Sequence, residues 1–411
     1  MIEWLHRVEP DRIFLRADER TWSYGQVIQE VESRLTETPR LIQPSLEPDS
    51  VFEVIAGIAG GGGTIVGPEP ETAVPGDAQL VVFTSGTSGP PKGVRLTKLN
   101  LTGAAAASAE HLGHGPDDDW LLAMPLHHVA GISIIVRQAY TGGAVTLLPE
   151  FDAQAVAGAM RGTVTMVSVV PTMLGRLIEH GPYIGLRAVL VGGGPIPDGL
   201  LQEASTQGLP VLPSYGMTET FGQVATLRPG SPLERKAHPL PGVDIRTDRN
   251  GRVAVKGPQV SPGYVGEPDR ADPWLVTNDL GEMDESGALH ILGRADTVIV
   301  TGGENVDPER VEMVLRGTPG IQEAVVVGLP DPEWGQVVVC VFTGDAEHPG
   351  EWASRHLPGF MVPKRWIRVR AIPRTPIGKP DRAASRALAE QGADGGVEGE
   401  VESQANRHRS E

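Results

Sequence analysis

The stretch FTSGTSGPPKG, residues 83–93, decides how this chain is expected to fold. Small hydroxyl residues alternate in it with glycine, and Lys92 stands near its end. Hydroxyl groups and unhindered backbone N–H groups are what a loop needs to surround phosphate oxygens, and a lysine adds a mobile positive charge. The stretch therefore predicts a phosphate-binding loop. The residues expected to bind are Thr84, Ser85, Gly86, Thr87, Ser88, Gly89 and Lys92.

The residues on either side of this loop indicate an α/β fold. The apolar run 80–83 predicts a buried strand before the loop, and residues 99–112 predict a helix after it. Ligands of α/β folds bind where strands end in loops. A run rich in Gly, Ser and Thr is by itself more often a surface turn, but these flanks favour a binding loop. It does not follow the nucleoside-triphosphatase pattern, because Pro91 and Gly93 stand beside the lysine in place of Gly and Ser or Thr.

Size, composition and charge limit the classes of function. The 411 residues suffice for two or three domains, and 52 Gly with 36 Pro suit an α/β enzyme with many turns. The net charge of −17 argues against nucleic acid as a partner. Cys340 is the single cysteine, which excludes internal disulfides and cysteine-based metal sites and is typical of the cytoplasm. Charges at residues 1–7 and the lack of a long apolar run predict neither a signal peptide nor stable membrane insertion.

The order of apolar and turn-rich segments predicts two domains and a tail. Residues 120–230 alternate apolar strands with helical patterns, as in a parallel sheet, whereas residues 240–293 are turn-rich, as in an antiparallel or barrel-like segment. We therefore expect a large N-terminal α/β domain over residues 1–293. A small α+β domain is expected over residues 294–385, and the Gly-, Glu- and Gln-rich residues 386–411 are expected to be disordered.

Three consecutive glycines follow the apolar run 188–191. Glycine allows a backbone to approach a flat ring closely, so these residues can bind a nucleotide base. A simple turn from a strand into a helix explains them equally well, and both interpretations stay open. The glycines are Gly192, Gly193 and Gly194.

The run SYGMTET, residues 214–220, combines an aromatic residue, a glycine, hydroxyls and an acid. With the phosphate loop it resembles the motifs of the acyl-adenylate-forming (AMP-binding) enzymes, which include the acyl-CoA synthetases. The resemblance implies that the ring of Tyr215 stacks on adenine and that Thr218 meets a phosphate as a catalytic residue. Glu219 would supply a hard oxygen ligand for a Mg²⁺ that bridges phosphates. The nucleotide-binding residues implied here are Ser214, Tyr215 and Gly216.

Later motifs extend the resemblance to the C-terminal part of the chain. It implies that Asp279 accepts both ribose hydroxyls, that Arg294 reaches the ribose or a phosphate, and that Asp296 is the hinge of the small domain. The glycine-containing residues 301–308 would let the pantetheine arm of coenzyme A pass close to the backbone. Lys379 is the expected catalytic lysine, which neutralises charge that develops between the carboxylate and the α-phosphate.

The short region before the phosphate loop bears on the choice of acid. Short chains of this layout resemble the branch of the family that ligates o-succinylbenzoate to coenzyme A in menaquinone biosynthesis. The run MPLHHVAGI, residues 124–132, is similar to a stretch that lines the acyl pocket there. The resemblance places His128 at the gate between the acyl pocket and the nucleotide, as a catalytic and substrate-binding residue. A buried core histidine is the alternative.

The second carboxylate of that acid needs a partner in the pocket. Arg137 follows the apolar run 132–136 of a predicted helix, and charged residues are rarely buried without a partner. A ligand carboxylate would be such a partner. A salt bridge to an acid of the protein is an equal alternative.

These motifs, which cover about 300 residues in the family's order, predict an ATP-dependent acid–CoA ligase. We expect it to use ATP, Mg²⁺ and coenzyme A and to act on a small-molecule acid, o-succinylbenzoate. Another aryl- or acyl-CoA ligase and a carrier-loading adenylation enzyme are alternatives. The presence of Lys379, Glu219 and the full loop argues against a catalytically silent adenylate-binding protein. The acceptor and the oligomeric state stay open, with a homodimer as one alternative.

Overall fold

The computed structural model describes residues 1–84, 91–181, 183, 185–234, 236–374 and 380–393. They divide into two compact units, and the chain crosses between them more than once. The large unit comprises Met1–Thr277 and Glu282–His290, and the small unit comprises Asn278–Gly281 and the chain from Ile291 onward. The predicted division after residue 293 differs from this one in residues 278–281 and 291–293.

A nine-stranded sheet forms the centre of the large unit. Its six central strands run parallel, and antiparallel strands close both edges. In spatial order the strands are β13 (His238–Pro239), β12 (Gly222–Thr226), β11 (Val211–Met217), β10 (Ala188–Val191), β9 (Met166–Val169), β7 (Asp119–Leu122), β8 (Ala144–Leu147), β1 (Ile13–Ala17) and β2 (Arg20–Ser23). The βαβ pattern predicted for residues 120–230 is confirmed.

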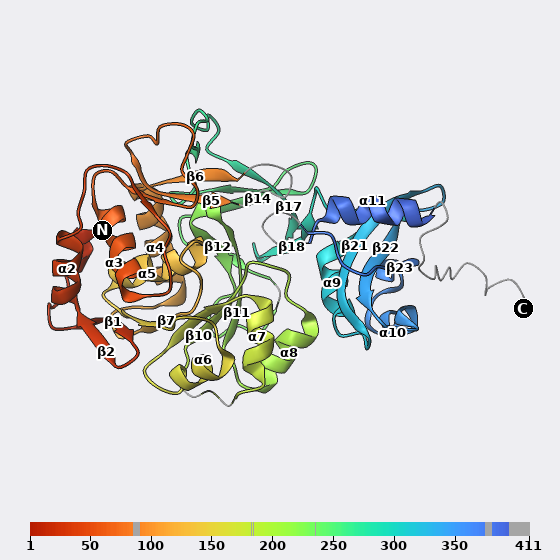
Figure 1. Ribbon diagram of the computed structural model, residues 1–411, viewed down its shortest axis with the longest axis horizontal. Helices are drawn as coiled ribbons and strands as arrows, with labels where there is room; N and C mark the ends of the chain where they lie inside the picture. Colours follow the sequence, from red (N-terminus) through yellow and green to blue (C-terminus); the bar gives the residue numbers. More distant parts are fainter. Residues whose placement is uncertain (85–90, 182, 184, 235, 375–379, 394–411) are drawn as a thin grey trace, which may run out of the picture. The chain divides into compact units, whose positions relative to one another are not determined.

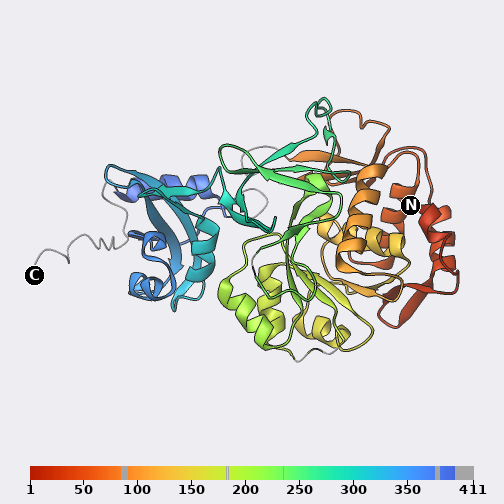
Figure 2. The ribbon, with the colours of Figure 1, turned by 180° about the vertical axis from the view of Figure 1, so that it is seen from behind.

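Helices cover both faces of this sheet because successive strand residues point to opposite sides. In β10, Leu190 packs into one core and Val189 into the other. The first core includes α1 (Ile2–Leu5), α2 (Tyr24–Glu32), α3 (Pro48–Ala59), α4 (Lys98–Leu112) and α5 (Val129–Thr141). The second includes α6 (Ala153–Ala159), α7 (Pro171–Ile178) and α8 (Asp198–Thr206). Figures 1 and 2 show the yellow-green helices α6–α8 on one side of the strands, away from α4 and α5.

A five-stranded sheet carries the two strands that flank the phosphate loop. Its order is β16 (Gly263–Tyr264), β6 (Lys92–Thr97), β5 (Ala78–Thr84), β4 (Thr64–Val66) and β3 (Arg40–Ile42). The predicted strand and helix around the loop are confirmed as β5 and α4. Helix α4 begins where Thr97 and Asn100 form a reciprocal capping box, and it ends at Gly113 in the left-handed region.

The turn-rich segment forms a third, four-stranded sheet. Its order is β14 (Asp244–Thr247), β15 (Arg252–Lys256), β17 (Leu275–Met283) and β18 (Leu289–Arg294). Strands β14 and β15 pair antiparallel, as predicted for this segment. Both β17 and β18 contain residues of the two units.

The small unit is an α+β structure with its own core. Its sheet has the order β20 (Glu304–Val306), β19 (Ile299–Thr301), β22 (Gly335–Gly344) and β21 (Ile321–Asp331), with β23 (Arg365–Arg368) also paired to β22. Its helices are α9 (Pro308–Leu315), α10 (Pro349–His356), η2 (Gly359–Met361) and α11 (Arg382–Ala393).

Helix α11 corrects the prediction that the tail is disordered from residue 386. Residues 386–393 are helical, and Ala389 is fully buried in a core that includes Val325 and Val327 of β21. Arg382 at the start of the helix pairs with the buried Glu312 and donates to the carbonyl of Val326 at 2.6 Å. These contacts with the rest of the small unit order the helix, and the residue composition alone does not reveal them. No helix among the described residues could cross a membrane.

Candidate active site

Three of the predicted binding sites of the large unit lie at one edge of the nine-stranded sheet. His128 follows β7, the three glycines follow β10, and Tyr215 lies near the end of β11. These three strands are parallel members of the same sheet, so their carboxyl ends meet at the same edge. The fold thus brings together motifs that are far apart in the sequence.

The glycines after β10 are explained in part by packing between strands. A Cβ at Gly192 would lie 2.8 Å from the carbonyl oxygen of Ser214, so this position requires glycine. Gly193 has a φ of +77°, which also favours glycine. A Cβ at Gly194 would meet no atom within 4 Å. The turn interpretation therefore accounts for Gly192 and Gly193, and the expected nucleotide contact stays a prediction.

Glu219 lies on a tight turn between β11 and β12. Gly216 is required there because a Cβ would lie 2.0 Å from the carbonyl oxygen of Gly222. After Gly216 the chain forms η1 (Thr218–Thr220) and turns back through Phe221, which is fully buried at a φ of +50°. The turn therefore places Glu219 at a defined point at the end of β11.

The phosphate loop joins the adjacent strands β5 and β6. Thr84 and Lys92 are paired across these strands, and the Thr84 hydroxyl is 3.4 Å from the Lys92 carbonyl oxygen. The predicted loop residues between them lie outside the described residues. They are Ser85, Gly86, Thr87, Ser88 and Gly89.

Lys92 and Glu219 are connected through one short strand. Tyr264 of β16 donates its hydroxyl to Oε1 of Glu219 at 2.8 Å. The ammonium group of Lys92 lies 5.0 Å from the centre of the Tyr264 ring and 2.9 Å from Oε1 of Glu267. Burial, and then the charge of Glu219, raises the pKa of the Tyr264 phenol above its ordinary value, so the hydroxyl keeps its proton.

This arrangement fits Mg²⁺ bound together with a nucleotide. Among the described residues, no group of three or more His, Cys, Asp or Glu side chains could hold a metal ion. Mg²⁺ commonly uses one or two carboxylates together with substrate phosphates and water. Glu219 is partly exposed, and Tyr264 connects it to the strands that flank the phosphate loop. Its carboxylate therefore suits that mode of binding.

Arg137 is buried on α5 without a carboxylate partner among the residues that the structure describes. Its side chain is about 4% exposed, its Nε has no hydrogen-bond partner, and the guanidinium lies 5.1 Å from the centre of the Trp120 ring. Burial without a counter-charge lowers the pKa of Arg137 to about 9. A Cβ at Gly222 would lie 3.5 Å from Nη2, so the guanidinium faces the turn that carries Glu219.

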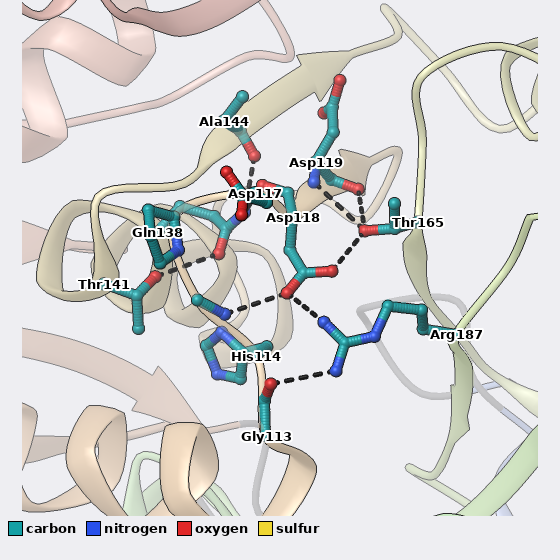
Figure 3. Close-up of polar contacts among 12 residues, drawn as sticks. Gly113, His114, Asp117, Asp118, Asp119, Gln138, Thr141, Ala144, Thr165 and Arg187 are labelled. Carbon is teal, nitrogen blue, oxygen red and sulfur yellow. Dashed lines mark hydrogen bonds and ion pairs between the residues drawn. The ribbon is translucent and has the colours of Figure 1, made fainter.

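The alternative of a salt bridge between Arg137 and an acid of the protein is not seen in the described structure. Asp118, a buried acid of the same unit, is paired with other donors (Figure 3). It accepts from the Gly115 N–H at 2.9 Å and the Thr165 hydroxyl at 2.8 Å, and it pairs with Arg187.

His128 lies at the N-terminus of α5, nine positions before Arg137 on the same helix. It is exposed, and its ring centre lies 4.3 Å from that of His127. The alternative of a buried core histidine is therefore wrong. Its expected role at the gate of the acyl pocket stays a prediction.

The small unit brings its own predicted residues together. Arg294 donates two hydrogen bonds to Asp296, at 3.0 and 2.9 Å, and its Nη1 lies 3.6 Å from Oδ1 of Asp279. The hydrogen bond to Asp296 raises the pKa of Arg294. Lys379 lies outside the described residues, and Arg374 and Pro380 form an isolated antiparallel bridge.

Sequence reasoning missed Tyr264 and Glu267. Neither lies in a recognised motif, and Glu267 is 175 residues from Lys92 in the sequence. The contact arises because β16 pairs with β6, placing Tyr264 opposite Val94. A two-residue strand leaves no periodic pattern that could reveal this pairing.

Known proteins resemble the chain in both sequence and structure. The model of the AMP-binding enzyme family matches residues 34–265, and that of the AMP-binding enzyme C-terminal domain matches residues 310–379. The 2-succinylbenzoate–CoA ligase of Bacillus licheniformis is 38% identical over 328 residues, which are 74% of this chain and 68% of that protein.

Two solved structures are similar over nearly the whole chain. One is o-succinylbenzoate coenzyme A synthetase from Bacillus subtilis with the acyl-adenylate intermediate, at a TM-score of 0.80 and 28% identity, covering 92% of this chain and 97% of that one. The other is the same Bacillus subtilis enzyme with ATP and a magnesium ion, at a TM-score of 0.81 and 27% identity, covering 93% and 99%.

Proposed function

The chain belongs to the AMP-binding enzyme family, and we propose that it ligates o-succinylbenzoate to coenzyme A with ATP. The carboxylate of the acid attacks the α-phosphorus of ATP, and the bond to pyrophosphate breaks. The thiol of coenzyme A then attacks the acyl carbon, and AMP leaves as the thioester forms. The observation that carries the choice of acid is Arg137, a buried guanidinium without a protein carboxylate among the described residues.

The large unit supplies the groups for the first half-reaction. The backbone between β5 and β6, with Thr84 and Lys92, binds phosphate oxygens, and Tyr215 stacks on adenine. Glu219 holds Mg²⁺, which neutralises phosphate charge when it is bound. These roles agree with the position of the residues at the ends of β5 and β11.

Arg137 binds the ring carboxylate of the acid, while the succinyl carboxylate reacts. A charge-assisted contact of this kind contributes roughly 1.5–3 kcal/mol, and the low polarity around the buried guanidinium strengthens it. His128, at the start of the same helix, would lie closer to the reacting end of the acid.

The small unit supplies Asp279 for the ribose, Asp296 as the hinge and Lys379 for adenylation. Lys379 would donate to oxygens that gain charge as the carboxylate attacks phosphorus. We place the reaction in the cytoplasm because Cys340, the single cysteine of the sequence, is a free thiol.

A panel of acids tests this proposal. ATP–pyrophosphate exchange is measured with o-succinylbenzoate, with 4-oxo-4-phenylbutanoate, which lacks the ring carboxylate, with benzoate and with a fatty acid. Thioester formation with coenzyme A is then measured. We expect o-succinylbenzoate to be preferred and coenzyme A to be the acceptor. A preference for a simple aryl or fatty acid would indicate another acyl- or aryl-CoA ligase. Exchange without thioester formation would indicate a carrier-loading adenylation enzyme.

The variant Lys379→Ala adds a second arm to the same experiment. It should lose exchange by several orders of magnitude yet still convert presynthesised acyl-adenylate to thioester. Equal loss of both half-reactions would contradict the assignment of Lys379 to adenylation alone.

A further inference from the structure

The segment of residues 261–267 is attached to both sides of the phosphate-binding region. On one side, Tyr264 pairs with Val94 of β6, and the N–H of Val265 donates to the carbonyl of Gly93 at 2.8 Å. On the other side, the N–H of Ser261 donates to the carbonyl of Glu219 at 2.7 Å. The segment therefore connects the strand that follows the phosphate loop to the turn that carries Glu219.

Within this segment, Tyr264 contacts the two charged side chains themselves. Its hydroxyl donates to Oε1 of Glu219 at 2.8 Å, and its ring lies under the ammonium group of Lys92 at 5.0 Å. Glu267 pairs with the same ammonium group at 2.9 Å, so Lys92 does not neutralise Glu219. Tyr264 is thus the donor to the Glu219 carboxylate, while Lys92 pairs with a different acid.

We infer that Tyr264 is a positioning residue for MgATP: its hydroxyl fixes one oxygen of Glu219 and leaves the other to bind the metal ion. The inference rests on the proposed function, because it requires that the chain binds ATP with Mg²⁺. The carboxylate plane of a glutamate rotates broadly about its last torsion. A hydrogen bond to one oxygen removes this freedom before the nucleotide arrives, which lowers the entropic cost of binding.

The alternative is that Tyr264 only packs β16 against β6. The contribution of Tyr264 to ATP binding would then come from its ring. Removal of the hydroxyl would change ATP binding equally with and without Mg²⁺. The two roles therefore differ in whether the loss depends on the metal ion.

The variant Tyr264→Phe separates these roles, because it keeps the ring over which Lys92 lies. The Kd of ATP is measured by calorimetry in excess Mg²⁺ and again in EDTA. We expect binding in Mg²⁺ to weaken about fivefold and binding in EDTA to stay unchanged. The matched control is Tyr183→Phe, which removes a hydroxyl that donates to the carbonyl of Leu177 at 2.6 Å in the core beside α7. It should leave both Kd values unchanged.

The variant Glu219→Gln completes the test, since Tyr264 acts through Glu219. Adding Tyr264→Phe to Glu219→Gln should produce no further metal-dependent loss, whereas independent effects would add. An unchanged Kd in Mg²⁺, or an equal loss in Mg²⁺ and EDTA, would overturn the role of Tyr264 while leaving the proposed function intact. Wild-type binding of ATP that is indifferent to Mg²⁺ would overturn both. If Tyr264→Phe has a lower Tm than Tyr183→Phe, Glu219→Gln is compared with the Glu219→Gln and Tyr264→Phe double variant at a temperature where both are folded. That comparison then decides whether Tyr264 acts through Glu219.

Discussion

Asp118 and Arg137 are both buried charges of the large unit, at about 3% and 4% exposure, but they differ in their surroundings. Asp118 accepts hydrogen bonds from a backbone N–H and a hydroxyl and pairs with Arg187. The guanidinium of Arg137 lies over the ring of Trp120, and no carboxylate among the described residues pairs with it. A buried charge is costly unless it is paired, so the first is explained by the fold, and the second is where we propose that the acid binds.

The difference extends to the stability of the fold. A satisfied buried carboxylate contributes to stability because its donors would otherwise be left without partners. An unpaired buried guanidinium lowers stability, and the cost is retained where function needs it. Substitutions at the two positions should therefore affect different measurements.

The largest expected effect is on the stability of Asp118→Asn. The amide would face donors with a donor of its own, so the free energy of unfolding should fall by about 2–4 kcal/mol. Urea unfolding measures this change. Asp117→Asn is the matched control, because Asp117 is 96% exposed and its pair with Arg12 should be worth less than about 1 kcal/mol. Equal effects of the two variants would remove the distinction between buried and exposed acids here.

The variant Arg137→Met should weaken binding of the substrate without destabilising the fold. Methionine fills most of the space with apolar atoms, so the free energy of unfolding should stay the same or rise. The KM for o-succinylbenzoate should rise at least about tenfold, which corresponds to 1.4 kcal/mol. Arg137→Lys keeps the charge and should lose less. A normal KM in Arg137→Met would show that another group meets the ring carboxylate.

The smallest expected effect is on the pH dependence of stability through His114. Burial, and then the charge of Arg137, lowers the pKa of His114 to about 4. The charge of Asp118 opposes this shift, and that of Arg187 adds to it. As the pH falls, His114 is therefore protonated in the unfolded chain before it is protonated in the folded protein. Stability is therefore full above about pH 6.5 and declines toward pH 4.

Removal of the Arg137 charge should raise the pKa of His114 and so reduce this decline. Between pH 7 and pH 5, Arg137→Met should lose less stability than the wild type by roughly 0.5 kcal/mol. Urea unfolding at both pH values measures the difference. Equal slopes in the two proteins would mean that the charge of Arg137 does not reach His114.

The sequence by itself determined the local elements and the family. The apolar run 80–83 and the helix-like run 99–112 predicted β5 and α4, and the motifs predicted the family that residues 34–265 and 310–379 match. These features depend on neighbours in the chain. Spacing and residue type therefore reveal them without knowledge of the packing.

Only the tertiary structure decided which partners the side chains have. Composition predicted disorder from residue 386, yet Ala389 is buried against β21 because a distant strand offers an apolar surface. The contact of Tyr264 with Glu219 and the lack of a described counter-charge at Arg137 have the same origin. Burial and electrostatic pairing are sums over neighbours in space, and strands far apart in the sequence supply most of those neighbours.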